Sequence, residues 1–428
     1  MNRERIAWVA NGGLVVAGLT ITALGPALPF LIREYGLSLT LAGTVFGFFA
    51  GGRISTVFVS LLIAERFNRK TLLAFGHGGF ALGLIGFSLG VTWWMHLVAI
   101  AIAGAGYGLT DVLSNAVVAE IYPERRGFAL NRLQAYYGVG CILGPVFAAV
   151  ILGLALSWRL IFAVAAVVAL AVTAFTLSTS FAKSAGSRYP HDFPEGMRQV
   201  SGVAGTSGNP GMPGRDSGAQ GAPGKPSTSI RLGFLRRPAL LIPAFAVGMY
   251  TGVGNGLIGW INTYFEEMLQ APAVVATIVL LGYNGGITIG RFLGSRYSDR
   301  LGYGRTIILN SIAAAVCLGT GALTPSVPLG ALSFVLTGLF LAGVAPTAMA
   351  AATSLLPNRA GAVSSRMFVF GAGGSLVIPF SMGVAGDLFS LQVGMGVAAL
   401  LVMTIAPVTA FLSRATARDG GRSVKRAA

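Results

Sequence analysis

The chain has 428 residues, of which 54% are hydrophobic and 10% charged, and its mean hydropathy is +0.74. Soluble domains carry roughly 25% charged residues, so this composition excludes an ordinary water-soluble domain. The net charge of +16 would suit nucleic acid if the 30 Lys and Arg residues formed one patch. They gather instead in short connections such as 66–70 and 125–126 and in the tail after residue 413. Positive charge biased to one side of a membrane produces this pattern, so we predict a lipid bilayer as partner and no nucleic acid.

Long apolar runs follow one another along most of the chain. A helix rises about 1.5 Å per residue, and roughly 20 apolar residues therefore cross the hydrocarbon layer. The predicted spans are 7–32, 41–63, 72–92, 96–119, 129–155, 159–181, 239–265, 274–293, 306–323, 328–352, 361–386 and 391–413. The first run follows Arg3 and Arg5 and is longer than the apolar segment of a cleavable signal peptide, so we expect it to remain attached.

The spans form two groups of six. Residues 182–238 are rich in Gly, Pro and Ser and are much longer than the other connections, which indicates a flexible cytoplasmic linker. The predicted divisions are therefore an N-terminal bundle (1–181), this linker, a C-terminal bundle (239–413) and a basic cytoplasmic tail (414–428).

Three landmarks recur at one constant offset along the chain, which indicates an internal repeat. Glu65-Arg66 becomes Asp299-Arg300, the frame PERRG at 123–127 becomes PNRAG at 357–361, and Pro145 becomes Pro379. Six spans separate equivalent points, so the repeats run in the same direction across the membrane, with a substrate path between them. We predict an all-α membrane protein of twelve transmembrane helices in two six-helix pseudo-repeats that works by alternating access.

One carboxylate lies well inside a predicted span. Asp111 is near the middle of 96–119, where a charged side chain costs on the order of 3 kcal/mol by insertion scales. Gly104, Gly108 and Asn115 share its helix face at a spacing of about four residues. We expect this face to meet a central cavity, and Asp111 is the candidate proton carrier.

Two arginines lie within spans, Arg53 in the second and Arg291 in the eighth. Each is a candidate partner for Asp111 or a ligand for a substrate. A static ion pair that only neutralises both charges remains an equal alternative for Arg53.

A set of amides and aromatic rings supplies candidate substrate contacts. Amides pair with hydroxyl groups and flat rings cover the apolar face of a sugar. Buried Asn and Gln also join neighbouring helices, and that alternative holds for any one of them taken alone. Together with Asn115, the candidates are Gln134, Tyr137, Asn255, Trp260, Tyr283 and Asn284.

Two short loops place an acid beside bases at the cytoplasmic face. They are ERFNRK at 65–70 and SDRLGYGR at 298–305, and a carboxylate there can hold a base or a helix N-terminus in one conformation and release it in another. The loops resemble the signature of the major facilitator superfamily and its second copy. The resemblance implies cytoplasmic gating by Glu65, Arg66, Arg69, Asp299 and Arg300.

A longer stretch is similar to helices 4 and 5 of the fucose permease group of sugar:proton symporters. It runs AGYGLTDVLSNAVVAEIYPERRGFALNRLQAYYGVGCILGP and ends at Pro145. The resemblance implies that Asp111 and Asn115 occupy a carboxylate-and-Asn pattern that serves proton coupling and sugar binding. Within it, GVGCILGP (138–145) also resembles part of a motif of drug:proton antiporters, so efflux stays open.

The sequence therefore predicts a secondary active transporter that moves a small polar, sugar-like solute, with proton-coupled uptake as the first hypothesis. Proton-coupled efflux of a drug or metabolite is the alternative. The sequence carries no nucleotide-binding loop, nucleophile elbow or metal-ligand pair, so we expect no enzyme activity, no cofactor and no metal. We expect a monomer in the cell membrane, the inner membrane if the source is bacterial, with both termini cytoplasmic.

Overall fold

A computed structural model describes residues 2–63, 67–122, 125–181, 238–355 and 360–427. These ranges contain helices and connections and no strand. The first half contains α1 (Asn2–Tyr35), α2 (Leu39–Ile63), α3 (Arg69–Leu89), α4 (Trp93–Ile121), α5 (Arg126–Gly153) and α6 (Arg159–Ser178). The second half contains α8 (Pro238–Glu267), α9 (Ala273–Leu301), α10 (Tyr303–Leu323), α11 (Val327–Leu341), α12 (Val344–Leu355), α13 (Ala360–Leu388) and α14 (Leu391–Ala427). The all-helical prediction is confirmed.

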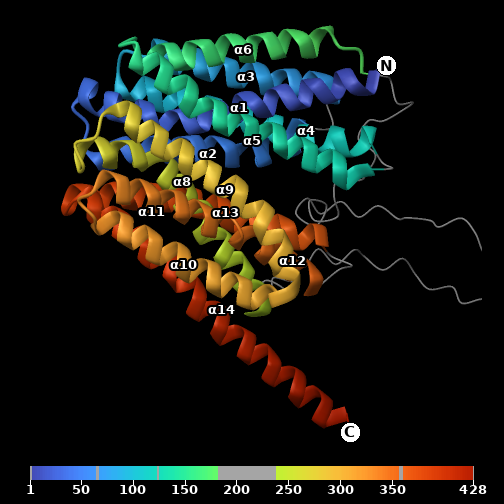
Figure 1. Cartoon of the computed structure of the whole chain (residues 1–428). Coiled ribbons are helices and arrows are strands. Elements are labelled where there is room, and N and C mark those ends of the chain that lie inside the picture. Colours follow the sequence, from blue (N-terminus) through green and yellow to red (C-terminus); the bar gives the residue numbers. More distant parts are fainter. Residues whose placement is uncertain (1, 64–66, 123–124, 182–237, 356–359, 428) are drawn as a thin grey trace, which may run out of the picture.

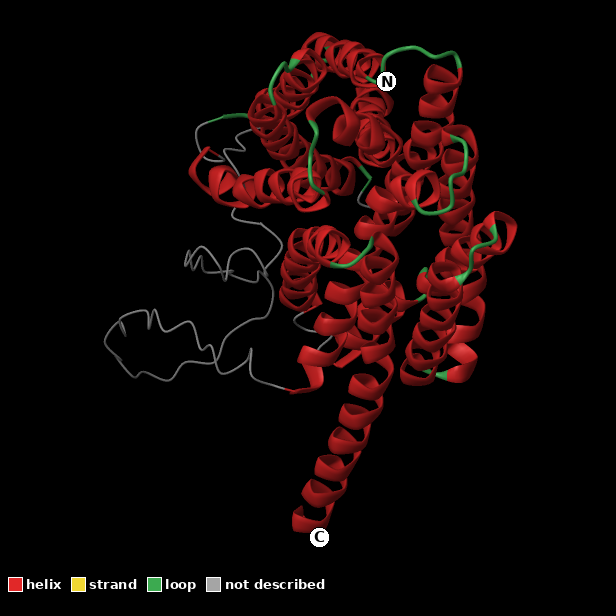
Figure 2. Ribbon diagram, turned by 90° about the vertical axis from the view of Figure 1, so that its left-hand side faces the viewer, coloured by secondary structure: helices red, strands yellow, loops and turns green. Residues whose placement is uncertain are grey.

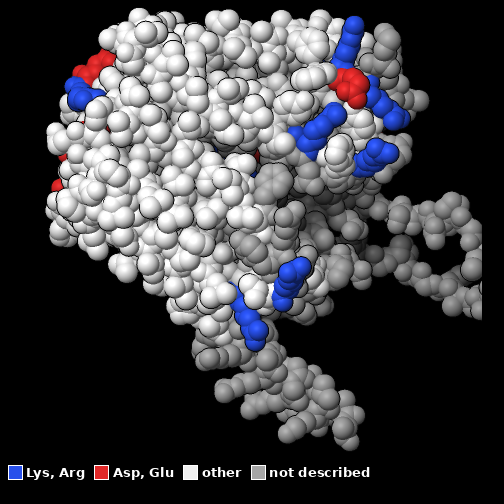
Figure 3. Space-filling view, in the orientation of Figure 1, with Lys and Arg blue, Asp and Glu red and all other residues white. Residues whose placement is uncertain are grey.

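The helices are long because hydrocarbon offers the backbone no hydrogen-bond partners, so each crossing segment must satisfy its own N–H and C=O groups. In the described residues, eleven segments are long and apolar enough to span a membrane. The 25-residue α2, whose side chains after Thr56 lie outside the described residues, is not among these eleven, and it packs against α4 of its own half and α13 of the other half. Figure 3 shows a broad band of uncharged surface with charged side chains gathered toward its two ends.

The internal repeat is visible in the helix boundaries. The helices α2, α3 and α4 begin at positions 39, 69 and 93, and α9, α10 and α11 begin at positions 273, 303 and 327. Each pair of starts is separated by the offset that relates Glu65 to Asp299. The turn before each first helix repeats as well, because Gly36 and Gln270 stand at the same offset and have φ angles of 58° and 53°. The offset read from three short motifs therefore applies to the backbone.

Two features differ from the predicted spans. The segment 328–352, predicted as one helix, is broken at Ala342–Gly343 into α11 and α12, which together still form one candidate span. The last span, predicted to end at 413, continues as α14 to Ala427. Apolar periodicity locates a crossing but carries no signal for a local break or for a polar continuation of the helix.

The two halves lie side by side, with α1–α6 forming one and α8–α14 the other, and both chain ends lie at the same end of the bundle (Figures 1 and 2). We call this end the terminal side and the opposite end the distal side. On the distal side, Asp387 of α13 accepts hydrogen bonds of 2.7 Å from the backbone N–H groups of Leu39 and Thr40 at the start of α2. Arg33 of α1 pairs with Glu266 of α8 at 2.9 Å. The halves are therefore held together where the distal ends meet.

Candidate transport site

An ion pair lies at the depth where the sequence predicts the site. Arg53, halfway along α2, donates from Nη2 to Oδ2 of Asp111 on α4 at 2.8 Å. The side chain of Arg53 is 43% exposed and that of Asp111 is 20% exposed. The prediction placed these residues as possible partners, and the structure brings them together. Because neither is fully enclosed, the pair can be solvated and can separate without stranding a dry charge.

Glycines bring α2 and α4 close enough for this pair to form. A β-carbon on Gly104 would collide with the carbonyl oxygen of Phe49, and one on Gly52 would collide with that of Ala101. One turn further on, a β-carbon on Gly108 would lie 2.9 Å from the carbonyl oxygen of Arg53. The glycine face predicted to line a cavity thus packs directly on α2, and this packing sets the separation at which Arg53 reaches Asp111.

Asn115 and Tyr107 hold the two charges in place. Asn115 Nδ2 donates to the backbone oxygen of Asp111 at 2.8 Å and to its Oδ1 at 3.0 Å. The Arg53 guanidinium lies 5.0 Å from the ring centroid of Tyr107, and Phe49 stacks on the same ring at 5.9 Å. In this conformation Asn115 orients the carboxylate of Asp111.

Across the interface, α9 carries the second arginine. Arg291 donates from Nη2 to the hydroxyl of Tyr250 on α8 at 3.2 Å. The helix α9 also packs against α5 of the first half. Arg291 therefore lies on a helix that contacts both halves of the molecule.

Polar groups from the second half join this region. Asn255 Nδ2 on α8 donates to Ser375 Oγ on α13 at 2.8 Å. The Tyr283 ring is fully buried, its hydroxyl has no hydrogen-bond partner among the described residues, and a β-carbon on Gly254 would lie 3.7 Å from this hydroxyl. Asn284 Nδ2 donates to the backbone oxygen of Leu280 in its own helix at 3.0 Å. Tyr283 thus has an unused hydroxyl, whereas the amide nitrogens of both Asn residues are engaged.

Two other predicted solute contacts, Trp260 and Gln134, lie apart from these polar groups. The Trp260 ring is 0% exposed, donates to the backbone oxygen of Pro379 at 2.9 Å and lies 6.3 Å from Phe46 of the other half. It offers no free ring face to a solute in this conformation. Gln134 is exposed on α5.

The predicted gating loops are only partly described. Glu65 and Arg66 lie outside the described residues, as does the side chain of Asp299. Arg69 at the start of α3 pairs with Glu120 near the end of α4, and Arg300 is exposed. Gating by these residues stays a prediction.

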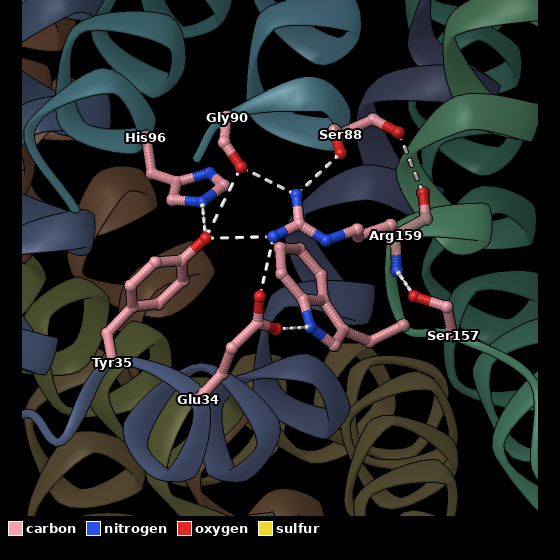
Figure 4. A network of polar contacts seen from close by, with 8 residues as sticks. Glu34, Tyr35, Ser88, Gly90, His96, Ser157 and Arg159 are labelled. Atoms are coloured by element: carbon pink, nitrogen blue, oxygen red, sulfur yellow. Dashed lines mark hydrogen bonds and ion pairs between the residues drawn. The ribbon is translucent and has the colours of Figure 1, made fainter. Parts of the chain in front are cut away.

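A polar network on the distal side was not predicted (Figure 4). Arg159 at the start of α6 donates to Glu34 Oε1 at 2.6 Å, to the Tyr35 hydroxyl at 2.8 Å and to the backbone oxygen of Gly90 at 2.6 Å. His96 Nε2 lies 2.9 Å from the same Tyr35 hydroxyl. The network ties the distal ends of α1, α3, α4 and α6 together. Its sequence signal is weak, since Glu34, His96 and Arg159 lie far apart in the chain at the ends of apolar runs.

The arrangement of two matching helical halves around charged residues at mid-depth defines a class of membrane transporter. The family model of the Major Facilitator Superfamily matches residues 11–379 and 269–428. The chain belongs to this superfamily and is a multi-pass membrane protein.

Individual relatives are distant. The chain is 22% identical to a protein TsgA homolog of Serratia proteamaculans (strain 568) over 181 residues, which cover 42% of this chain and 46% of that protein. It is 30% identical to an uncharacterized MFS-type transporter of Mycobacterium tuberculosis (strain ATCC 25618 / H37Rv) over 161 residues, which cover 37% of this chain and 23% of that protein. The matched region thus spans less than half the length of these curated relatives.

Solved structures agree over nearly the whole chain. A bacterial homolog of the human lysosomal transporter Spinster, in an inward-facing and unoccupied conformation, has a TM-score of 0.75 and 13% identity, covering 98% of both chains. A D-xylose-proton symporter has a TM-score of 0.71 and 16% identity, covering 96% of this chain and 99% of that one. The nucleoside transporter NupG has a TM-score of 0.75 and 12% identity, covering 96% of this chain and all of the other. At these identities the likeness establishes the fold, and the resemblance to the fucose permease group stays a prediction.

Proposed function

We propose that the protein is a proton-coupled uptake transporter of a small polar, hydroxylated organic solute in the cell membrane, with both termini in the cytoplasm. The observation that carries the proposal is the partly exposed Arg53–Asp111 pair at mid-depth, which joins α4 to α2, the helix that packs against α13 of the other half. Ionisable groups inside spanning helices commonly mark substrate or proton pathways.

The distal contacts support alternating access. Asp387 and the Arg33–Glu266 pair join the halves on one side of the membrane, while the Arg53 side chain retains 43% of its surface. In this conformation the halves are therefore joined on the distal side. Transport then requires the distal contacts to break as contacts on the terminal side form.

Asp111 is the proposed proton carrier, and Arg53 is the proposed counter-charge that pairs with it in one conformation and leaves it in another. In this conformation Arg53 donates to the carboxylate and Asn115 orients it. In the proposed cycle, the carboxylate carries the coupling proton in a conformation in which Arg53 no longer contacts it. Tyr137, Asn255 and Ser375 are the proposed hydrogen-bonding contacts of the solute.

The test uses purified protein in liposomes with a pH gradient and a panel of labelled sugars and related acids. We expect concentrative uptake that a protonophore abolishes. The Asp111→Asn variant, made together with Arg53→Gln so that no charge is stranded, should still exchange solute across the membrane but no longer concentrate it. Full concentrative uptake by this double variant would contradict proton coupling through Asp111. Extrusion of unrelated apolar compounds with no uptake of polar solutes would instead favour efflux.

A further inference from the structure

Arg291 carries a positive charge that the described part of the chain does not neutralise. Its hydrogen bond goes to the neutral hydroxyl of Tyr250, and no carboxylate of a described residue lies within ion-pair distance. The residue follows an apolar stretch of α9, a helix that continues to Leu301. A cation at such a position normally pairs with an acid or faces a water-filled path or a ligand.

The neighbours of Arg291 place it between the halves and away from lipid. Tyr250 comes from α8, and α9 itself packs against α5 of the other half. Arg291 is nonetheless exposed. An exposed arginine surrounded by helices of both halves faces the path between them.

The contrast with Arg53 indicates which arginine is available. Arg53 donates to Asp111 at 2.8 Å and its charge is already balanced. The repeat offers Arg291 no equivalent acid, because the residue that corresponds to Asp111 in the second half is Ala345.

A second polar group near Arg291 also lacks a partner. Among the described residues, the buried hydroxyl of Tyr283, eight positions before Arg291 on α9, has no hydrogen-bond partner. An unused buried hydroxyl costs stability unless something pairs with it in another state. Arg291, Tyr250 and Tyr283 together supply a charge and two hydroxyls, the donors that a planar or tetrahedral oxyanion accepts.

We infer that the transported solute is an anion, a hydroxylated organic acid or a sugar phosphate, whose carboxylate or phosphate group binds Arg291 with help from Tyr250 and Tyr283. This inference rests on the proposed transport function and specifies its substrate class. It replaces a neutral sugar-like solute with a charged one. Symport of a monoanion with one proton moves no net charge, so uptake of a carboxylate would be insensitive to membrane potential.

The experiment measures binding to the purified full-length protein with matched pairs of neutral and anionic probes. D-glucose is compared with D-glucuronate and with D-glucose 6-phosphate, and D-galactose with D-galacturonate. We expect an anionic member to bind at least about 10-fold more tightly than its neutral partner, since charged hydrogen bonds are the stronger class. The carboxylate and phosphate probes decide which anion the site takes.

Substitutions assign the effect to this arginine. Arg291→Gln should weaken anion binding about 10-fold or more, and Arg291→Lys should restore part of it because the charge remains while the planar fork is lost. Arg5→Gln, which removes one positive charge from an exposed position at the start of α1, is the matched control and should bind as the native protein does. Tyr283→Phe should weaken anion binding while raising the melting temperature of the solute-free protein, an opposite pair of effects that a purely structural role would not give.

The inference is overturned if neutral probes bind as tightly as anionic ones, if no anionic probe binds, or if Arg291→Gln binds anions unchanged. Failure of the transport proposal would be separate, because proton coupling is tested at Asp111. If the Asp111 variant loses concentrative uptake but the native protein binds neutral solutes as tightly as anions, only the anion inference is overturned. If anion binding depends on Arg291 but the Asp111 variant still concentrates solute, only the coupling scheme is overturned.

Discussion

The two halves of the molecule share their helix packing and differ in their charges. In the first half, β-carbons on Gly52 and Gly104 would strike the backbone of the facing helix, and at the corresponding positions of the second half Gly286 and Gly338 would do the same. The partners are equivalent too, since Ala101 and Phe49 correspond to Val335 and Tyr283. The α2–α4 contact and the α9–α11 contact therefore have the same helix packing in both repeats.

The two halves begin to differ one helical turn beyond Gly104 and its equivalent Gly338. In the first half α4 continues unbroken past Gly108 and supplies Asp111 to Arg53. In the second half the equivalent helix breaks at Ala342–Gly343, and α12 packs against α8 and α10. Arg291 is thus left without a neighbouring acid among the residues that the structure describes. The comparison teaches that a duplicated scaffold keeps the backbone contacts that position helices, while its charged residues stand at non-equivalent positions, since Arg53 corresponds to Ile287 and Arg291 to Val57.

The largest expected effect is a difference in protein stability between the variants Arg53→Gln and Arg291→Gln. Arg53→Gln leaves the Asp111 carboxylate without its cation and should destabilise the protein by about 2–3 kcal/mol, below the roughly 3–5 kcal/mol of a fully buried pair because the carboxylate is partly exposed. Arg291→Gln strands no acid and should be neutral or slightly stabilising. Thermal unfolding of the purified protein in detergent measures both.

The double variant Arg53→Gln/Asp111→Asn is the control for this comparison. It should recover most of the stability lost in Arg53→Gln, because neither charge remains unpaired. Equal losses from Arg53→Gln and Arg291→Gln, or additive losses in the double variant, would remove the distinction between the halves.

The shared packing can be tested with one methyl group in each half. Gly104→Ala and Gly338→Ala should each destabilise by about 1–3 kcal/mol because the added carbon meets backbone, which cannot step aside. Gly51→Ala on α2 is the matched control, since a β-carbon there meets nothing within 4 Å, and it should be neutral or gain up to about 1 kcal/mol of helix propensity. A neutral result at only one of the two packed glycines would show that the contacts are not equivalent.

The distal contacts provide a smaller effect on conformation. Asp387→Asn removes a negative charge from the N-terminus of α2 and should weaken the closed distal state by about 0.3–1 kcal/mol. Spin labels at Val91 and Pro325, equivalent turns of the two halves, should then report a larger fraction of molecules with separated distal ends. An unchanged distance distribution would exclude Asp387 as a distal latch.

The smallest expected effect is at the other distal contact. Arg33 is 58% exposed but Glu266 is only 8% exposed, so Arg33→Gln alone would leave a buried carboxylate unpaired. The double variant Arg33→Gln/Glu266→Gln removes both charges and should change the same distance distribution less than Asp387→Asn does. A larger shift from this double variant would reverse the ranking of the two distal contacts.

Much of the site could be predicted because a charge in an apolar run is conspicuous. Asp111, Arg53 and Arg291 were identified in this way, and the pairing of Arg53 with Asp111 was among the stated alternatives. Trp260 was predicted as a solute contact from residue type alone, whereas its ring is packed between α8, α13 and Phe46. Residue type does not say which face of a helix meets a neighbouring helix.

The sequence by itself determined the number and order of the crossings, the division into two repeats and the offset between them, because apolar length and repeated motifs are local signals. Only the tertiary structure decided that Arg53 is neutralised and Arg291 is not, that Glu34, His96 and Arg159 meet, and that Asp387 reaches the start of α2. These contacts join residues that are distant in the chain. They depend on how closely glycine faces let helices approach and on where one helix breaks, which no single segment encodes.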